Sequence, residues 1–444
     1  MTVLNGTLPN WILEQEARAL RTRLARVKPF ALLEPMLPAA AIQPSAQRSI
    51  ERYLAVGRKE LRGRINSFIE WLGEPEGRQA TPEDAQRRFT MLRMRFNIVL
   101  SQFDLFADVI TQRSEHESGV HLSGLDIVAR DALDLKGHYY EVPPVICYLD
   151  RGPGAAIRRA RTRMPGGSEN PVAIIRVPRE RMVGSGIASS LIHEAGHQGA
   201  ALLDLVETLR PVLKERARAG GGGVAWQMWE RWISEIVADF WSVAHVGVGS
   251  TLGLMAVVSL PRAFVMRFGG DDPHPVPWIR VKLSCAMGRA LYPHEQWDTA
   301  AALWEAFYPM GDLDEERRQL FAALEASMPE FVELLVNHRP PKLRGHTLAE
   351  AMPLADRTPE LLRAHYARWR ESPHLMREAP PALVFAVVGQ VRIEGKISPE
   401  EESRMLAYLL TYWAMRSTLN TTEFSARPAA LKEEPEPAAV ALAQ

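Results

Sequence analysis

The spacing of apolar residues along the chain predicts a mainly helical protein. Between residues 45 and 73, apolar side chains recur three or four positions apart, which places them on one face of an α-helix. Thr81 followed by Pro82 is typical of a helix start, because threonine caps helices and proline suits the first turn. Helical patterns cover residues 10–75, 81–115, 187–216, 224–246, 252–268, 278–291, 295–308, 313–337, 359–371 and 399–419.

Two short stretches in the middle of the chain have a different character. Residues 141–150 and 171–178 are β-like runs, and Pro178 closes the second. The connector between them, residues 151–170, is rich in glycine, proline and arginine and is predicted to be a loop. The fold class is therefore mainly α with a small β element.

The composition narrows the possible functions. The chain has 444 residues, and its 53 basic and 53 acidic residues give a formal net charge of zero. We therefore expect no broad electrostatic binding of nucleic acid. The two cysteines, Cys147 and Cys285, are too few for a disulfide framework or a four-cysteine zinc site.

No secretory signal or membrane span is evident. The N-terminus lacks a basic segment followed by an apolar one. The most apolar stretch, residues 246–266, is interrupted by glycines, serines, Pro261 and Arg262, and is interpreted as a buried core helix. We therefore expect a cytoplasmic protein.

The strongest chemical signal is His193-Glu-Ala-Gly-His197, an H-E-x-x-H motif. On a helix, His193 and His197 lie one turn apart on the same face, so both imidazoles can bind one Zn²⁺. Glu194 follows the first ligand and can act as general base on a zinc-bound water. The alternative is a helix with two surface histidines that bind nothing.

A second helix offers further ligands. Glu235 and Asp239 are four residues apart, on a face that also holds Ser242, in a segment otherwise rich in Trp, Ile, Val and Phe. A catalytic zinc takes three protein ligands and keeps one open position, so Glu235 is predicted as the third ligand. Asp239 is predicted to accept the N–H of a ligand histidine.

Downstream, His274 lies in a proline-rich segment and Arg280 at a helix start. Either could stabilise the oxyanion of a tetrahedral intermediate opposite the metal. The alternatives are a surface histidine and an arginine that is ion-paired within the fold. Arginines 158, 159, 161 and 163 could meet an acidic partner, but a solvated basic loop is the favoured interpretation, because runs of one charge sign are usually just solvated.

In their order, these motifs resemble those of gluzincin zinc metallopeptidases, in particular the branch of the CAAX prenyl endopeptidases and HtpX-like proteases. The matching segments are HEAGH, EIVAD and HPVPWIR, within residues 170–285. The resemblance implies His193, His197 and Glu235 as zinc ligands and Glu194 as catalytic base. It implies Asp239 as the residue that holds a ligand histidine by a hydrogen bond. It also implies that His274 and Arg280 lie near the scissile carbonyl.

The resemblance further implies a zincin-like core with an edge strand beside the cleft. Residues 171–178 would be that strand, and Ile174, Ile175 and Arg176 would bind an extended substrate; a plain buried strand is the alternative. The expected organisation is an N-terminal helical region (1–136), a zincin-like catalytic domain (137–310), a C-terminal helical region (311–420) and a disordered tail (421–444). The glycines at 220–223 could form a hinge or a surface loop.

The leading hypothesis is zinc-dependent hydrolysis of a peptide or protein substrate. Two rival hypotheses remain. In one, zinc only ties helices together in a structural protein whose helical flanks bind a partner. In the other, the same site hydrolyses a non-protein amide.

Overall fold

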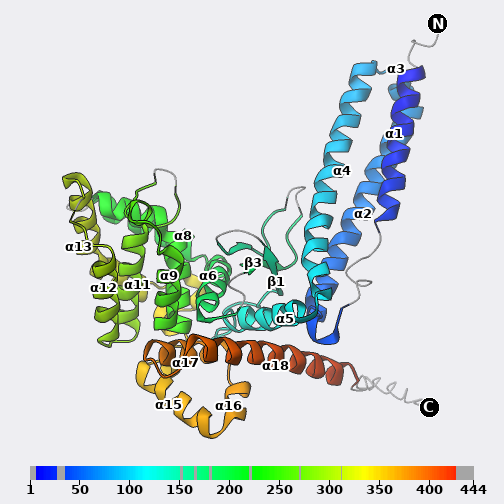
Figure 1. The fold of residues 1–444 in the computed structure, drawn as a ribbon. Helices are drawn as coiled ribbons and strands as arrows, with labels where there is room; N and C mark the ends of the chain where they lie inside the picture. Colours follow the sequence, from blue (N-terminus) through cyan, green and yellow to red (C-terminus); the bar gives the residue numbers. More distant parts are fainter. Residues whose placement is uncertain are drawn as a thin grey trace, which may run out of the picture.

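The computed structural model describes residues 7–27, 36–150, 154–164, 168–179, 183–219, 223–269, 272–311 and 313–426. Its N-terminal part is a long three-helix arm, formed by α1 (Thr7–Arg26), α2 (Pro44–Gly73) and α4 (Pro82–Thr111), with the short α3 (Pro75–Gln79) at its far end (Figure 1). The Thr81 hydroxyl accepts a hydrogen bond of 3.1 Å from the Asp84 amide and so caps α4 as predicted.

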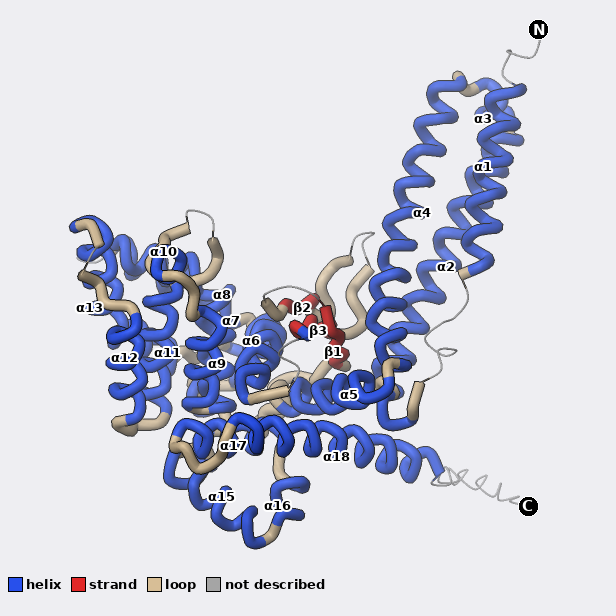
Figure 2. The backbone as a smooth tube through the Cα atoms, viewed as in Figure 1, coloured by secondary structure: helices blue, strands red, loops and turns tan. Residues whose placement is uncertain are grey.

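A three-stranded sheet lies where the arm meets the body (Figure 2). Its strands are β1 (Val145–Asp150), β2 (Ala156–Arg158) and β3 (Ala173–Pro178), in the order β1-β3-β2. β1 runs parallel to β3, and β2 runs antiparallel to it. β2 falls in the connector that was predicted to be a loop; its three residues are too few to show an alternating pattern.

The sheet separates two hydrophobic cores, because successive side chains of a strand point to opposite faces. Ile146 and Ile174 pack into the core of the arm. Cys147 and Ile175, one position further along each strand, pack into the core of the body. The core of the body is a single cluster with members from Leu122 to Trp413. Helices that precede the sheet in the sequence and helices that follow it therefore both contribute to this core.

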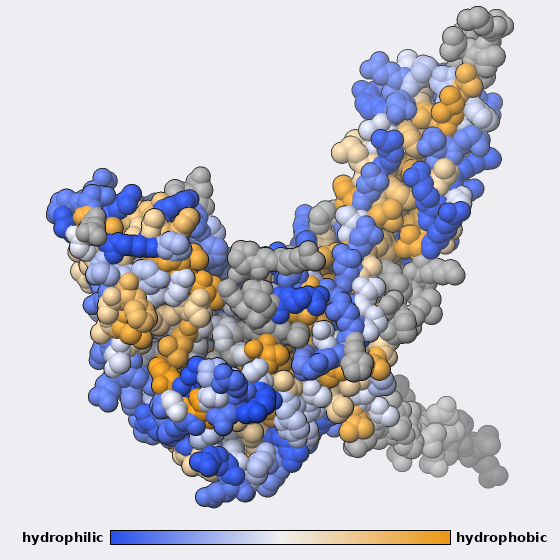
Figure 3. Space-filling view, viewed as in Figure 1, coloured by the Kyte–Doolittle hydropathy of each residue, from blue (hydrophilic) through white to orange (hydrophobic). Residues whose placement is uncertain are grey.

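The body consists of helices around α8. Figure 3 shows a hollow in the surface between this body and the arm. The helices are α5 (His116–Asp131), α6 (Ser185–Leu202), α7 (Leu205–Arg218), α8 (Gly223–Val246), α9 (Val248–Val258), α10 (Arg262–Val265), α11 (Pro277–Leu291), α12 (Gln296–Phe307), α13 (Glu315–Asn337), α14 (Leu348–Ala351), α15 (Pro359–Glu371), α16 (Pro373–Glu378), α17 (Pro381–Ile393) and α18 (Pro399–Ala426).

The mainly helical class is confirmed, and two predicted helices are divided. The pattern over 187–216 breaks between α6 and α7, where Asp204 adopts a left-handed conformation with φ 53°. The pattern over 252–268 ends at Val258, shortly before Pro261. α17 was not predicted, because residues 382–391 are buried on all sides and show no helical alternation of apolar and polar positions.

A buried ion pair between Arg113 and Asp126 binds the main chain of β1. Arg113 and Asp126 are both inaccessible, and their side chains approach to 3.0 Å. Arg113 also donates to the Cys147 carbonyl (2.7 Å), while Asp126 accepts from the Cys147 amide (2.6 Å). Together they satisfy the main chain of a strand at the junction of arm and body.

Two expectations fall partly outside the described residues. The glycines at 220–222 lie outside them, as does the expected tail from residue 427 onward; residues 421–426 belong to α18. Among the helices that the structure describes, none combines the length and apolar character that crossing a bilayer requires. The stretch 246–266 contains α9 and α10 instead.

Candidate metal centre

The centre is built where α6 and α8 cross at very short range. A Cβ atom on Gly196 would lie 2.8 Å from the Trp241 Cβ and 3.1 Å from the main chain of Ala238. Such distances are too short for any residue with a side chain, so glycine is required between the two histidines of the motif. The close crossing brings His193 and His197 of α6 opposite Glu235 of α8.

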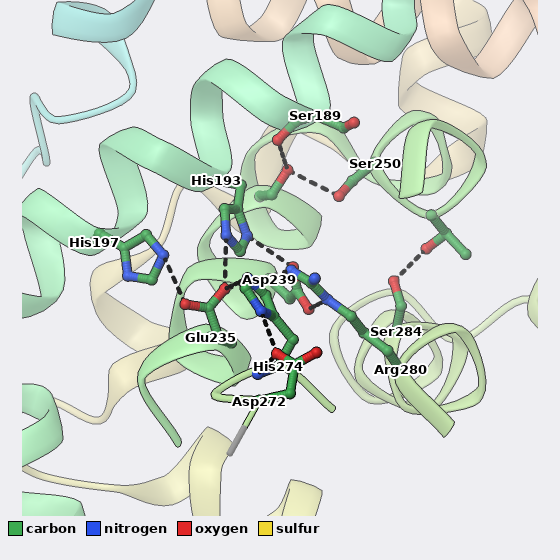
Figure 4. A network of polar contacts seen from close by, with 12 residues as sticks. Ser189, His193, His197, Glu235, Asp239, Ser250, Asp272, His274, Arg280 and Ser284 are labelled. Carbon is green, nitrogen blue, oxygen red and sulfur yellow. Dashed lines mark hydrogen bonds and ion pairs between the residues drawn. The ribbon is translucent and has the colours of Figure 1, made fainter. Parts of the chain in front are cut away.

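These three side chains converge on one point (Figure 4). His193 Nε2 lies 3.3 Å from Glu235 Oε2, and His197 Nε2 lies 3.4 Å from Glu235 Oε1. One ligand atom from each residue can be chosen so that all lie within 4.8 Å of one another. Glu235 Oε2 is buried and accepts no hydrogen bond from the described residues. An unsatisfied buried carboxylate oxygen facing imidazole nitrogens is suited to a cation, so the cluster could hold a metal ion.

Asp239 lies directly behind His193. Its Oδ1 atom is 2.7 Å from His193 Nδ1, on the side of the ring away from Glu235. Arg280, at the start of α11, donates from Nε to Oδ2 (2.6 Å) and from its terminal nitrogen to Oδ1 (2.8 Å). Burial favours the neutral acid, but Arg280 and His193 outweigh it and lower the pKa of Asp239 to about 2. The carboxylate is therefore charged and fixed between His193 and Arg280.

Arg280 is thus ion-paired within the fold, which was one of the two interpretations of this residue. Its guanidinium is 3.7 Å from Glu235 Oε2, further than from Asp239. Its Nε and one terminal nitrogen both donate to Asp239. From this position Arg280 holds the Asp239–His193 pair in place.

His274 approaches the centre from the segment before α11. Its Nδ1 lies 2.8 Å from Asp272 Oδ1, and its Nε2 lies 3.3 Å from Glu235 Oε2. With 48 % of its side chain exposed, it is the most accessible imidazole at the site. It therefore faces both the ligand carboxylate and the solvent.

Glu194 is buried next to the ligand histidines, and it lines both cavities at the centre. Burial raises the pKa of its carboxyl group, against the opposing effect of His193 and His197. A carboxylate with a raised pKa beside a metal site is suited to accepting and returning a proton.

Two cavities meet at the metal cluster. One, of about 140 Å³, extends towards Ser189, Ser250 and Leu254, and the other, of about 360 Å³, extends along β2. Both are lined by Ala155, His193, Glu194 and His274. A larger groove of about 840 Å³, between α2, α5 and α18, contains none of the predicted site residues.

Buried serines form a part of the site that the sequence did not reveal. Ser250 donates to the Ser242 hydroxyl (2.8 Å), and Ser242 donates to the main-chain carbonyl of Ser189 (3.2 Å). Ser189 lies one helical turn before His193, and Ser242 shares a face with Asp239, so helical spacing points to both. Ser250 comes from α9 and carries no such signal.

The prediction that residues 171–178 form an edge strand is wrong. β3 lies between β1 and β2, and Ile174, Ile175 and Arg176 are paired with β2 through Arg158, Ile157 and Ala156 respectively. Ile174 and Ile175 are buried, and Arg176 donates to the Gly154 carbonyl (3.3 Å). Among the described strands, β2 forms the outer edge that faces the site, because Ala156 and Ile157 line the cavity beside His193.

The chain matches no family model, no curated protein and no solved structure. The geometry of the centre is therefore the observation from which a function is inferred.

Proposed function

We propose that this protein is a zinc-dependent metallopeptidase. The observation that carries the proposal is the convergence of His193, His197 and Glu235 beside the buried carboxylate of Glu194. Two imidazoles and one carboxylate are a ligand set typical of catalytic zinc, which keeps one position open. The cavities of about 140 and 360 Å³ support an accessible site over a closed structural one.

A bound Zn²⁺ would polarise the scissile carbonyl and lower the pKa of a water molecule. Glu194 would take a proton from that water and pass it to the leaving amine, which its raised pKa favours. Asp239 would fix the ring of His193 through Nδ1, with Arg280 holding the carboxylate. His274, accessible and close to the ligands, would donate a hydrogen bond to the developing oxyanion.

The test compares the wild-type protein with the variant Glu194→Gln, both loaded with zinc. We expect wild-type protein to cleave unfolded proteins and the variant to bind zinc equally but lose turnover by at least about 100-fold. Elemental analysis gives the zinc content, and mass spectrometry identifies the cleaved bonds. Equal cleavage by both proteins would contradict the assignment of Glu194 as base.

The same assay separates the rival functions. Release of fragments from muropeptides but not from proteins would identify an amidase. Stoichiometric zinc together with no hydrolysis of either substrate class would identify a structural site. His193→Ala should lose zinc in every case, so an unchanged zinc content in that variant would contradict the ligand assignment.

A further inference from the structure

An arginine-rich loop follows β2 and lies beside the metal cluster. Arg158, Arg159 and Arg163 are exposed, and none of them has a carboxylate within ion-pair distance among the residues that the structure describes. Arg161 is also exposed, but lies 3.8 Å from Glu141. The loop therefore presents positive charge that no carboxylate in the described part of the chain neutralises.

Buried polar side chains fix the main chain of this loop. The Asn170 side chain is 1 % exposed and donates to the carbonyls of Arg158 (3.2 Å) and Arg159 (3.0 Å). Gln198, the residue after the ligand His197, accepts from the Ala160 amide (2.8 Å). The loop is thus hydrogen-bonded to α6, the helix that carries His193 and His197. The main-chain positions of the arginines are therefore fixed.

Two cavities at this side of the molecule share residues of β2 and its loop as lining. The cavity of about 360 Å³ contains His193, Glu194 and Arg159, and a further cavity of about 480 Å³ contains Arg158, Arg159 and Arg176. Both are also lined by Ala156 and Ile157 of β2. Ala156, Ile157 and Arg159 therefore border both the cavity at the metal cluster and the cavity that contains Arg158. β2 lies between the arm and α6 (Figure 2).

We propose that Arg158 and Arg159 select polypeptide substrates that carry an acidic stretch beside the bond to be cleaved. The inference rests on the proposed peptidase function and specifies its substrate class. An extended chain at the edge of β2 would receive main-chain hydrogen bonds from the strand and ion pairs from the two guanidinium groups. Nucleic acid would also meet the arginines, but it could not form main-chain hydrogen bonds with the strand edge.

The test uses pairs of fluorogenic peptides in which one member carries a run of glutamates and the other carries glutamines at the same positions. In one pair the run precedes the candidate bonds, and in a second pair it follows them. We expect kcat/KM of the zinc-loaded wild-type protein to be about threefold to tenfold higher for the glutamate peptide in low salt. The preference should shrink towards one at about 1 M salt, where the Debye length falls to about 3 Å. In low salt, the Arg159→Ala variant should lose most of the preference for the glutamate peptide.

Arg163→Ala is the matched control. Arg163 belongs to the same loop and is also exposed, but it lines neither the cavity at the metal cluster nor the cavity that contains Arg158. The variant loses the same charge, so it should keep most of the glutamate preference. An equal loss in both variants would show a general charge effect and would overturn the proposal.

A binding measurement separates this proposal from the proposed function. Fluorescence anisotropy with labelled peptides reports binding to zinc-loaded Glu194→Gln protein without turnover. Tighter binding of the glutamate peptide that depends on Arg159, with no cleavage by wild-type protein, would support acidic recognition and refute the peptidase function. Cleavage of both peptides at equal rates would support the peptidase and overturn the acidic preference. Tighter binding of a single-stranded oligonucleotide than of either peptide would also overturn it.

Discussion

Asp239 contacts His193 on one side and Arg280 on the other, and the 2.7 Å approach of its Oδ1 to His193 Nδ1 fixes which nitrogen faces Glu235. Asp239→Asn should weaken zinc binding about 10-fold to 100-fold, because the amide removes the charge that holds both neighbours. Competition with a chromophoric chelator measures this affinity. Glu230→Gln, on the same helix and paired with Arg210, is the control and should bind zinc as the wild type does. Wild-type affinity in Asp239→Asn would contradict the supporting role of Asp239.

The close crossing at Gly196 should be essential for the ligand geometry. In Gly196→Ala, the added methyl group would meet the Trp241 Cβ and the Ala238 main chain, so α6 and α8 must separate. We expect a loss of about 1–3 kcal/mol in the free energy of unfolding, together with weaker zinc binding. Urea unfolding of the metal-free protein and zinc titration measure the two effects separately.

Gly186→Ala provides the comparison for this substitution. Gly186 also lies in α6, but a Cβ atom there would meet no atom within 4 Å. It should therefore leave both stability and zinc affinity close to wild type. An equal loss in the two variants would mean that helix crossing is not the cause.

The Arg113–Asp126 pair should be costly to break. Asp126→Ala would leave the inaccessible guanidinium of Arg113 without its carboxylate and the Cys147 amide without its acceptor. We expect a loss of about 3–5 kcal/mol in the free energy of unfolding. In the double variant Arg113→Met/Asp126→Leu no charge is left unpaired, but the Cys147 amide and carbonyl both lose their partners, so only part of that loss should be recovered. A double variant as unstable as Asp126→Ala would contradict this account.

Stability should fall in mild acid because of His245. This imidazole is buried in α8, donates from Nδ1 to the Trp241 carbonyl (2.8 Å) and stacks on the Trp241 ring. Burial, with a contribution from Arg357, lowers its pKa to about 3. Below about pH 6.5 the unfolded chain binds a proton at this histidine that the folded protein does not bind. The free energy of unfolding should therefore decrease by about 1.4 kcal/mol per pH unit between pH 6 and 3 from this group alone.

Chemical unfolding of wild-type and His245→Phe protein across this pH range tests the effect. The variant should lose that part of the pH slope, since phenylalanine keeps the stacking but cannot bind a proton. His374→Gln replaces an exposed histidine and should leave the slope unchanged. Parallel pH curves for wild type and His245→Phe would rule out His245 as the cause.

The sequence predicts those parts of the molecule that depend on neighbours within one helix. Helical periodicity located most of the helices, and the spacing of His193, His197, Glu235 and Asp239 grouped residues that converge in the structure. Features that depend on contacts between distant segments were not evident. β2 became an edge strand only through its pairing with β3, and the anchoring of the arginine loop needs Asn170 and Gln198 from different elements.

The division of the sheet between two cores has a mechanical consequence. Ile146 and Ile174 are embedded in the arm, while β3 is hydrogen-bonded to β2, whose residues form one wall beside the metal cluster. The packing of the arm and the wall of the cavity beside His193 are thus joined through β3, so a substitution that shifts Ile174 should also displace β2.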